Sequence, residues 1–271
     1  MALVLALLAL VYVAIFVVLT AGAPPADGAA PKPGCFIYVH RANMAGVDEE
    51  QPAGIKRAAK FGGAEVDVRL TKDGRPFLVH DTTLTRITGG ADKRAVADLT
   101  AVELRQVRLA HGGRPWSFAH IVRVAARHQV PLVVELKAVP TGAPIRWTTA
   151  PEGVPTGFDR LAAATANAGW GDRIIWNNAG PTHADLLADP RFQPQTMLRA
   201  SEYVDDPQVL DDARYGAFPA GQLSADRVDL ITGHGAVPFM TTKAGRVAEA
   251  QALGVTTFQT HYPTKVKESC S

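Results

Sequence analysis

Short apolar stretches alternate along this chain with longer stretches in which apolar and polar residues recur at helical spacing. The apolar stretches, rich in Val, Ile, Leu and Phe, lie at 36–40, 64–70, 76–80, 131–137, 173–177, 195–199, 237–242 and 255–260. The amphipathic stretches lie near 52–61, 100–109, 117–128, 157–168, 181–188, 205–213, 225–233 and 244–253. Such alternation is typical of a parallel sheet whose strands are connected by helices.

Local signals refine this pattern. Asp73-Gly74 is a turn signal, so we interpret 64–80 as one strand with a hairpin extension. The weaker stretch YGAFPA near 215–220 is then the candidate for the eighth strand. Thr100 and Glu103 form a capping box that predicts a helix start, and Gly254 predicts a helix end. Past its first 34 residues the 271-residue chain has the size of one α/β barrel, so we predict a TIM (β/α)8 barrel.

The first 20 residues are uncharged and almost wholly apolar, and residues 21–34 are rich in Ala, Pro and Gly. We predict a transmembrane anchor or signal peptide at 1–22, a linker at 23–34 and the barrel domain at 35–271. The apolar stretch has the roughly 20 residues that a spanning helix needs and lacks the basic start of a signal peptide. An N-terminal hydrophobic helix that anchors the domain outside the cytoplasm is therefore favoured. The alternative is cleavage after Ala23 and secretion.

Charge and cysteine content narrow the setting. The net charge is only +2, and Lys and Arg are scattered, so nucleic acid is not an expected partner. Cys35 precedes the first strand and Cys270 is the penultimate residue, so a disulfide between them would join the two ends of a barrel. Such a bond requires an oxidising compartment, which agrees with export. The alternative is two unrelated thiols.

Charged residues follow or interrupt four of the apolar stretches. Because burying a charge in a strand is costly, these side chains are expected to face a cleft or a charged partner. The four clusters are His40-Arg41, Glu65-x-Asp67, His80-Asp81 and Glu135-x-Lys137.

The spacing within two of these clusters indicates a metal site. Glu65 and Asp67 are two residues apart on one strand, so both carboxylates project to the same side, and Glu135 and Lys137 repeat this pattern. Three converging carboxylates repel one another unless a cation lies between them. Oxygen ligands favour Mg²⁺, Ca²⁺ or Mn²⁺ over Zn²⁺. The alternative for each pair is a salt bridge with a neighbouring base.

His40 and His80 can supply proton transfer, because imidazole gives or takes a proton near neutral pH. Arg41 and Lys137 would add positive charge where a phosphate gains negative charge. The pattern assigns no role to five further histidines, at positions 111, 120, 128, 183 and 234.

Residues 36–137 resemble the glycerophosphodiester phosphodiesterase family of PLC-like phosphodiesterase TIM barrels. The motifs that carry the resemblance are His40-Arg41, Glu65-Val66-Asp67, Thr71-Lys72-Asp73-Gly74, His80-Asp81, Leu84, Arg86, Thr88 and Glu135-Leu136-Lys137. The resemblance implies metal-dependent hydrolysis of glycerophosphodiesters to glycerol 3-phosphate and an alcohol, by attack of a substrate hydroxyl or of water. It also implies that Glu65, Asp67 and Glu135 bind a divalent cation, Mg²⁺ or Ca²⁺. His40 and His80 would then be the acid–base pair, and Arg41 and Lys137 would contact phosphate.

The chain departs from the family pattern in two regions. Ala42 replaces the Gly that usually follows His-Arg, and the loop before Glu65 is shorter. Thr241-Thr242 stands where a Trp-Thr pair is common, and Thr260-His261-Tyr262-Pro263 stands where Thr-Asp-x-Pro is common. In the family these strands help to shape the glycerol and leaving-group side of the pocket, so the sequence does not determine the alcohol part of the substrate.

Three functions therefore compete. The first is a phosphodiesterase that acts on a small-molecule or lipid-derived glycerophosphodiester. The second is a phospholipase D-type enzyme that acts on intact lipid headgroups, in the manner of the spider-venom sphingomyelinases. The third is a catalytically degenerate barrel that binds a phosphorylated ligand. Retention of both histidines and all three carboxylates favours an enzyme.

Overall fold

The computed structural model describes residues 35–178, 183–192 and 195–270. The predicted anchor or signal peptide at 1–22 and the linker at 23–34 lie outside the described residues. Among the residues described, no helix combines the length and the apolar character needed to cross a membrane.

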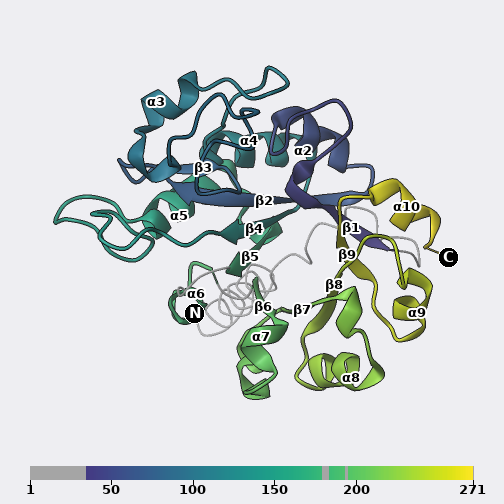
Figure 1. Cartoon of the computed structure of the whole chain (residues 1–271). Helices are drawn as coiled ribbons and strands as arrows, with labels where there is room; N and C mark the ends of the chain where they lie inside the picture. Colours follow the sequence, from purple (N-terminus) through teal and green to yellow (C-terminus); the bar gives the residue numbers. More distant parts are fainter. Residues whose placement is uncertain (1–34, 179–182, 193–194, 271) are drawn as a thin grey trace, which may run out of the picture. The chain divides into compact units, whose positions relative to one another are not determined.

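Eight parallel strands close into a barrel in the described part of the chain, as the alternating pattern predicts (Figure 1). Their order around the barrel is β1-β9-β8-β7-β6-β5-β4-β2, and β1 pairs with β2 to close it. The strands are β1 (Phe36–Val39), β2 (Gly62–Leu70), β4 (Leu132–Leu136), β5 (Ile174–Asn178), β6 (Thr196–Arg199), β7 (Tyr215–Pro219), β8 (Val237–Thr241) and β9 (Thr257–Thr260).

Helices follow most of the strands. The α-helices are α2 (Pro52–Ala58), α3 (Ala101–Gln106), α4 (Phe118–His128), α5 (Gly157–Ala168), α6 (His183–Ala188), α7 (Ala200–Tyr203), α8 (Ala225–Gly233), α9 (Val247–Ala252) and α10 (Pro263–Glu268). The 3-10 helices are η1 (His40–Ala42), η2 (Val96–Asp98), η3 (Gly171–Arg173), η4 (Pro207–Asp212) and η5 (Ala220–Gln222).

Most local predictions agree with these elements. The stretch YGAFPA contributes strand β7, and β3 (Pro76–Leu78) pairs antiparallel with β2 as the hairpin extension. The turn between them has Gly74 at φ +70°, a conformation that favours glycine. The capping box at the start of α3 is present, with Thr100 and Glu103 each accepting a backbone N–H from the other. The helix expected at 205–213 is instead the 3-10 helix η4, which is only six residues long and begins at Pro207.

The side chains of the barrel strands alternate between the lumen and the surrounding helices. A cluster of buried lumen residues fills the barrel, and the residues next to them in sequence pack in the separate outer core under the helices. The lumen cluster consists of Tyr38, Val133, Ile175, Met197 and Phe239. Two residues further along β4 and β5, the same alternation brings Glu135 and Asn177 to the lumen. The apolar lumen therefore gives way to polar side chains at the carboxyl ends of the strands.

A disulfide joins Cys35, just before β1, to Cys270, just after α10, with their Cα atoms 5.8 Å apart. Helix α10 lies beside β1 (Figure 1), so this bond links the two ends of the described domain next to the pairing of its first and last strands, β1 and β9.

Replacing Cys35 and Cys270 together with serine is expected to lower the free energy of unfolding by about 2–5 kcal/mol, because the bond restricts a very long loop of the unfolded chain. Denaturant unfolding of the oxidised protein and of the double variant measures the difference. Equal unfolding midpoints for the two proteins would show that the bond does not contribute to stability.

Candidate active site

Three carboxylates meet at the carboxyl end of the barrel. Glu65 and Asp67 lie on β2, and Asp67 is the register partner of Glu135 on β4. All three side chains are buried, and one oxygen of each lies within 4.8 Å of the others. The convergence of these residues, expected from their spacing, is therefore present.

This carboxylate cluster fits a divalent cation. Glu65 Oε1 and Asp67 Oδ2 are buried and have no hydrogen-bond partner among the residues that the structure describes. Burial, followed by the neighbouring charge of Asp67, raises the pKa of Glu65 well above its ordinary value. A buried carboxylate oxygen without a hydrogen bond is costly, and a cation held between the oxygens would remove that cost. Oxygen donors alone suit a hard cation of the Mg²⁺, Ca²⁺ or Mn²⁺ class.

Two basic side chains contact the same cluster. Lys137 Nζ lies 2.7 Å from Asp67 Oδ1 and also bonds to Glu135 Oε1, and Arg199 Nη2 lies 2.5 Å from Glu135 Oε2. Burial opposes ionisation of Glu135, but the charges of Lys137 and Arg199 outweigh it and hold its pKa below the ordinary value. Lys137 thus contacts carboxylates in this structure, whereas the family resemblance implies that it contacts phosphate.

His40 follows β1 and faces the carboxylate cluster with one ring nitrogen. Its Nε2 lies 3.6 Å from Glu65 Oε2, and its Nδ1 lies 2.6 Å from Nε2 of His261. Burial, His261 and Arg41 lower the pKa of His40 to about 3, so the ring is neutral at pH 7. Arg41 is held beside it, since its backbone N–H donates to Glu65 Oε2 and its Nε lies 3.6 Å from Asp67 Oδ2.

His80 follows β3 and is held by a chain of charged groups. Its Nδ1 lies 2.6 Å from Asp81 Oδ1, and the other oxygen of Asp81 accepts a hydrogen bond from Arg86 Nε. The guanidinium of Arg86 also donates two hydrogen bonds to the carboxylate of Glu49, and Glu49 lies 3.5 Å from Arg41. The network therefore connects the two loops that carry the histidines.

Several residues of the site were not predicted in these roles. Glu50 is buried and accepts a hydrogen bond from the backbone N–H of Asp67, so it holds the backbone of β2 in place at one of the three carboxylates. Arg69 donates to the backbone oxygen of His80 and has the two-residue spacing from Asp67 that would have placed it on the same face. Arg199 ends one apolar stretch and His261 directly follows another, as His40 does, but no spacing rule tied either of them or Glu49 to the site, because their contacts depend on how distant segments meet.

A cavity of about 400 Å³ opens beside the carboxylate cluster at the carboxyl ends of the strands. Its lining includes the polar side chains of His40, Glu135, Asn177, Arg199 and Gln259. The structure thus brings the predicted His40 and Glu135 to a space that can admit a small polar molecule.

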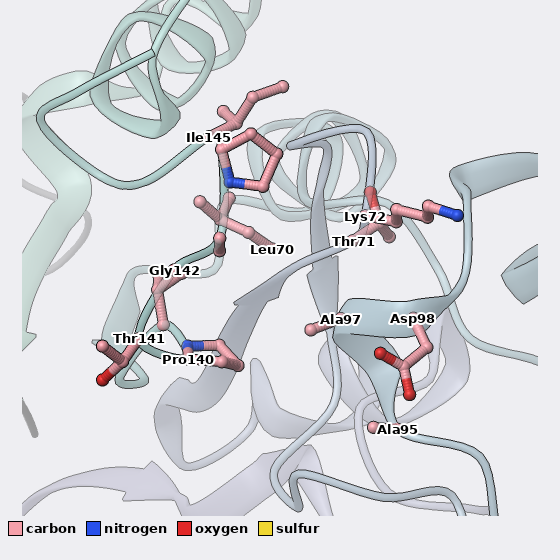
Figure 2. Close-up of a pocket in the computed structure, with 13 residues that line it drawn as sticks. Leu70, Thr71, Lys72, Ala95, Ala97, Asp98, Pro140, Thr141, Gly142 and Ile145 are labelled. Atoms are coloured by element: carbon pink, nitrogen blue, oxygen red, sulfur yellow. The ribbon is translucent and has the colours of Figure 1, made fainter.

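A larger cavity of about 530 Å³ lies between the β2–β3 turn, η2 and the loop after β4. Figure 2 shows Leu70, Pro140 and Ile145 around it, with Lys72 and Asp98 as its charged residues. It contains none of the candidate catalytic or metal-binding side chains, so size alone does not locate the site.

Comparison with known proteins agrees with the geometry. Residues 40–166 match the profile of the glycerophosphoryl diester phosphodiesterase family. A glycerophosphodiester phosphodiesterase of Caldanaerobacter subterraneus is 38% identical over 74 residues, which are 27% of this chain and 30% of that protein. The matched stretch thus spans less than a third of that relative.

Solved structures share the fold over a longer stretch. The glycerophosphodiester phosphodiesterase of Agrobacterium tumefaciens superimposes with a TM-score of 0.66 at 15% identity, over 86% of this chain and 99% of that one. A phosphodiesterase of Oleispira antarctica, in complex with the product sn-glycerol-3-phosphate, has a TM-score of 0.65 at 17% identity, over 86% and 95% of the two chains. At these identities the superpositions establish the barrel fold.

Proposed function

This chain belongs, through residues 40–166, to the glycerophosphoryl diester phosphodiesterase family, and we propose that it hydrolyses glycerophosphodiesters to glycerol 3-phosphate and an alcohol with the aid of a divalent cation. The observation that carries the proposal is the meeting of three buried carboxylates with His40 at one end of the barrel, where Arg69 of β2 also holds the backbone of His80. The glycerol 3-phosphate bound to the Oleispira antarctica enzyme supports the substrate class.

Positive charge in the site serves to bind the phosphodiester. Glu65, Asp67 and Glu135 would hold the cation, which when bound stabilises the negative charge that the phosphate gains in the transition state. Arg41 and Lys137 lie against the same carboxylates and place two further cationic groups beside it. These groups orient the phosphate before reaction and stabilise its added charge.

The Nε2 atoms of His40 and His80 carry out the proton transfers in this proposal. In each ring Nδ1 is engaged, by His261 for His40 and by Asp81 for His80, which leaves Nε2 for the substrate. One histidine takes a proton from the attacking oxygen, and the other gives a proton to the leaving alkoxide. Partners at Nδ1 fix the direction in which each ring presents its Nε2.

The protein is tested as a phosphodiesterase by offering it glycerophosphocholine in solution and, separately, sphingomyelin in vesicles. Phosphorus NMR distinguishes the two outcomes, because glycerol 3-phosphate and a ceramide phosphate have different signals. The proposal predicts turnover of the soluble diester. Turnover of the vesicle lipid alone would instead favour a phospholipase D-type enzyme.

We also propose that the barrel domain lies outside the cytoplasm, anchored through residues 1–22. The disulfide between Cys35 and Cys270 supports export, because such bonds persist in oxidising compartments. The uncharged apolar start of the chain supports attachment to a membrane. Cell fractionation is expected to place the full chain with the membranes. Its recovery from the medium would indicate signal cleavage, and recovery from the cytosol would contradict export.

A further inference from the structure

We propose that His261 is a positioning residue, which accepts a hydrogen bond from Nδ1–H of His40 and thereby keeps the lone pair of His40 Nε2 directed at the bound phosphodiester. This inference rests on the proposed function for its catalytic consequence, whereas the hydrogen bond itself can be tested independently. His261 touches no reacting atom in this account and acts only through His40.

The geometry separates the two ring nitrogens of His40. Nδ1 lies 2.6 Å from Nε2 of His261, and the centroids of the two rings are 4.1 Å apart with planes tilted by 53°. Nε2 lies on the side of the carboxylate cluster, 3.6 Å from Glu65 Oε2. At 2.6 Å one of the two facing nitrogens must carry a proton and the other must accept it, so the contact ties the tautomer of His40 to that of His261.

The closure of the barrel brings these two rings together. Strands β1 and β9 pair in parallel, with Val39 opposite Thr260. His40 and His261 are the residues that directly follow these two neighbouring strands. The turn that carries His261 is fixed by a hydrogen bond from the backbone N–H of Tyr262 to Thr260 Oγ1. Helix α10 starts at Pro263, immediately after this turn. The contact between the two rings therefore follows from the pairing of the first and last strands of the barrel.

The surroundings of His261 favour a neutral ring, which can accept a hydrogen bond from His40. Burial and the cation of Arg41 lower its pKa, with Lys243 acting in the same direction and Glu49 and Asp67 against it. His80 differs, because its Nδ1 faces a carboxylate, Asp81. The two histidines thus have partners of different charge, and His261 holds His40 without adding a negative charge beside the carboxylate cluster.

Substitution at His261 separates positioning from simple packing. His261→Ala is expected to lower kcat for a soluble glycerophosphodiester by roughly 10–100-fold, the usual cost of losing a partner of this kind, with little change in KM. His261→Gln is expected to recover most of the rate, because its amide oxygen is an acceptor near the position of Nε2. His261→Asn, with a shorter side chain, is expected to resemble the alanine variant. His234→Ala is the matched control, since it removes a surface histidine that contacts Asp211.

Nitrogen NMR of the histidine-labelled wild-type protein tests the hydrogen bond without any turnover. The inference predicts His40 as the Nδ1–H tautomer in wild type and in His261→Gln, and a shift toward the Nε2–H tautomer in His261→Ala. An Nε2–H tautomer in wild type, or equal kcat for the alanine and glutamine variants, would overturn it. A wild-type protein that shows the predicted tautomer but hydrolyses no glycerophosphodiester would contradict the proposed function and leave the hydrogen bond established.

Discussion

Alanine in place of either His40 or His80 is expected to lower kcat by about 10²–10⁴-fold, the usual contribution of a positioned acid or base. Each substitution removes one of the two Nε2 atoms assigned to proton transfer. KM is expected to change little, because the two cationic groups proposed to bind the phosphate, Arg41 and Lys137, remain beside Asp67. Steady-state kinetics at saturating metal measures both parameters.

The two alanine variants should keep their fold, since His40 and His80 are partly exposed, at 20% and 29% of their side-chain surfaces. Circular dichroism and metal affinity equal to those of wild type are the controls. The double variant is expected to lose little more than either single variant, because the histidines act in one reaction. Near-normal kcat in His40→Ala would remove that residue from the acid–base pair, and the same result in His80→Ala would remove the other.

Glu65→Gln is expected to abolish most of the metal affinity and, with it, turnover. The substitution keeps the shape of the side chain and removes the charge of a carboxylate whose Oε1 has no hydrogen-bond partner in the described part of the chain. The loss of affinity should exceed the roughly 10–100-fold that follows removal of an outer partner, because Glu65 is assigned directly to the cation. Isothermal titration with Mg²⁺ and with Ca²⁺ measures it.

The same variant has a second expected result in the absence of metal. Because Glu65 is fully buried near Asp67, its charge opposes folding when no cation is present, and Glu65→Gln should not lower the free energy of unfolding of the metal-free protein. Glu152→Gln, at an exposed position in the loop after β4, is the matched control for both measurements. Unchanged metal affinity in Glu65→Gln would exclude this residue from the ligand set.

Strand periodicity made the carboxylate cluster predictable. A strand turns alternate side chains to opposite faces, so the spacing of Glu65 and Asp67 determined that both would share a face, with Val66 in the outer core. Glu135 could be added because parallel strands end at the same side of a barrel, and its register with Asp67 agrees. These are local rules, which the sequence states directly.

Contacts between distant segments were not predictable in the same way. His261 meets His40 only because β9 closes on β1, and Arg199 reaches Glu135 from β6 across β5. The sequence shows that His261 departs from the family pattern and that it follows a strand. No spacing rule, however, links it to His40, about 220 positions away. The short helix α7, of four residues, gave too few turns for helical periodicity to be detected.

Release of glycerol 3-phosphate from glycerophosphocholine by the purified protein, with Mg²⁺, with Ca²⁺ and with EDTA, tests the central claim most directly. The claim is that the carboxylate cluster and the two histidines form one metal-dependent phosphodiesterase site. It predicts release with at least one of the cations, loss of release in EDTA and recovery when the cation is restored. Release that continues undiminished in EDTA, or no release with either cation although the protein binds it, would contradict the account.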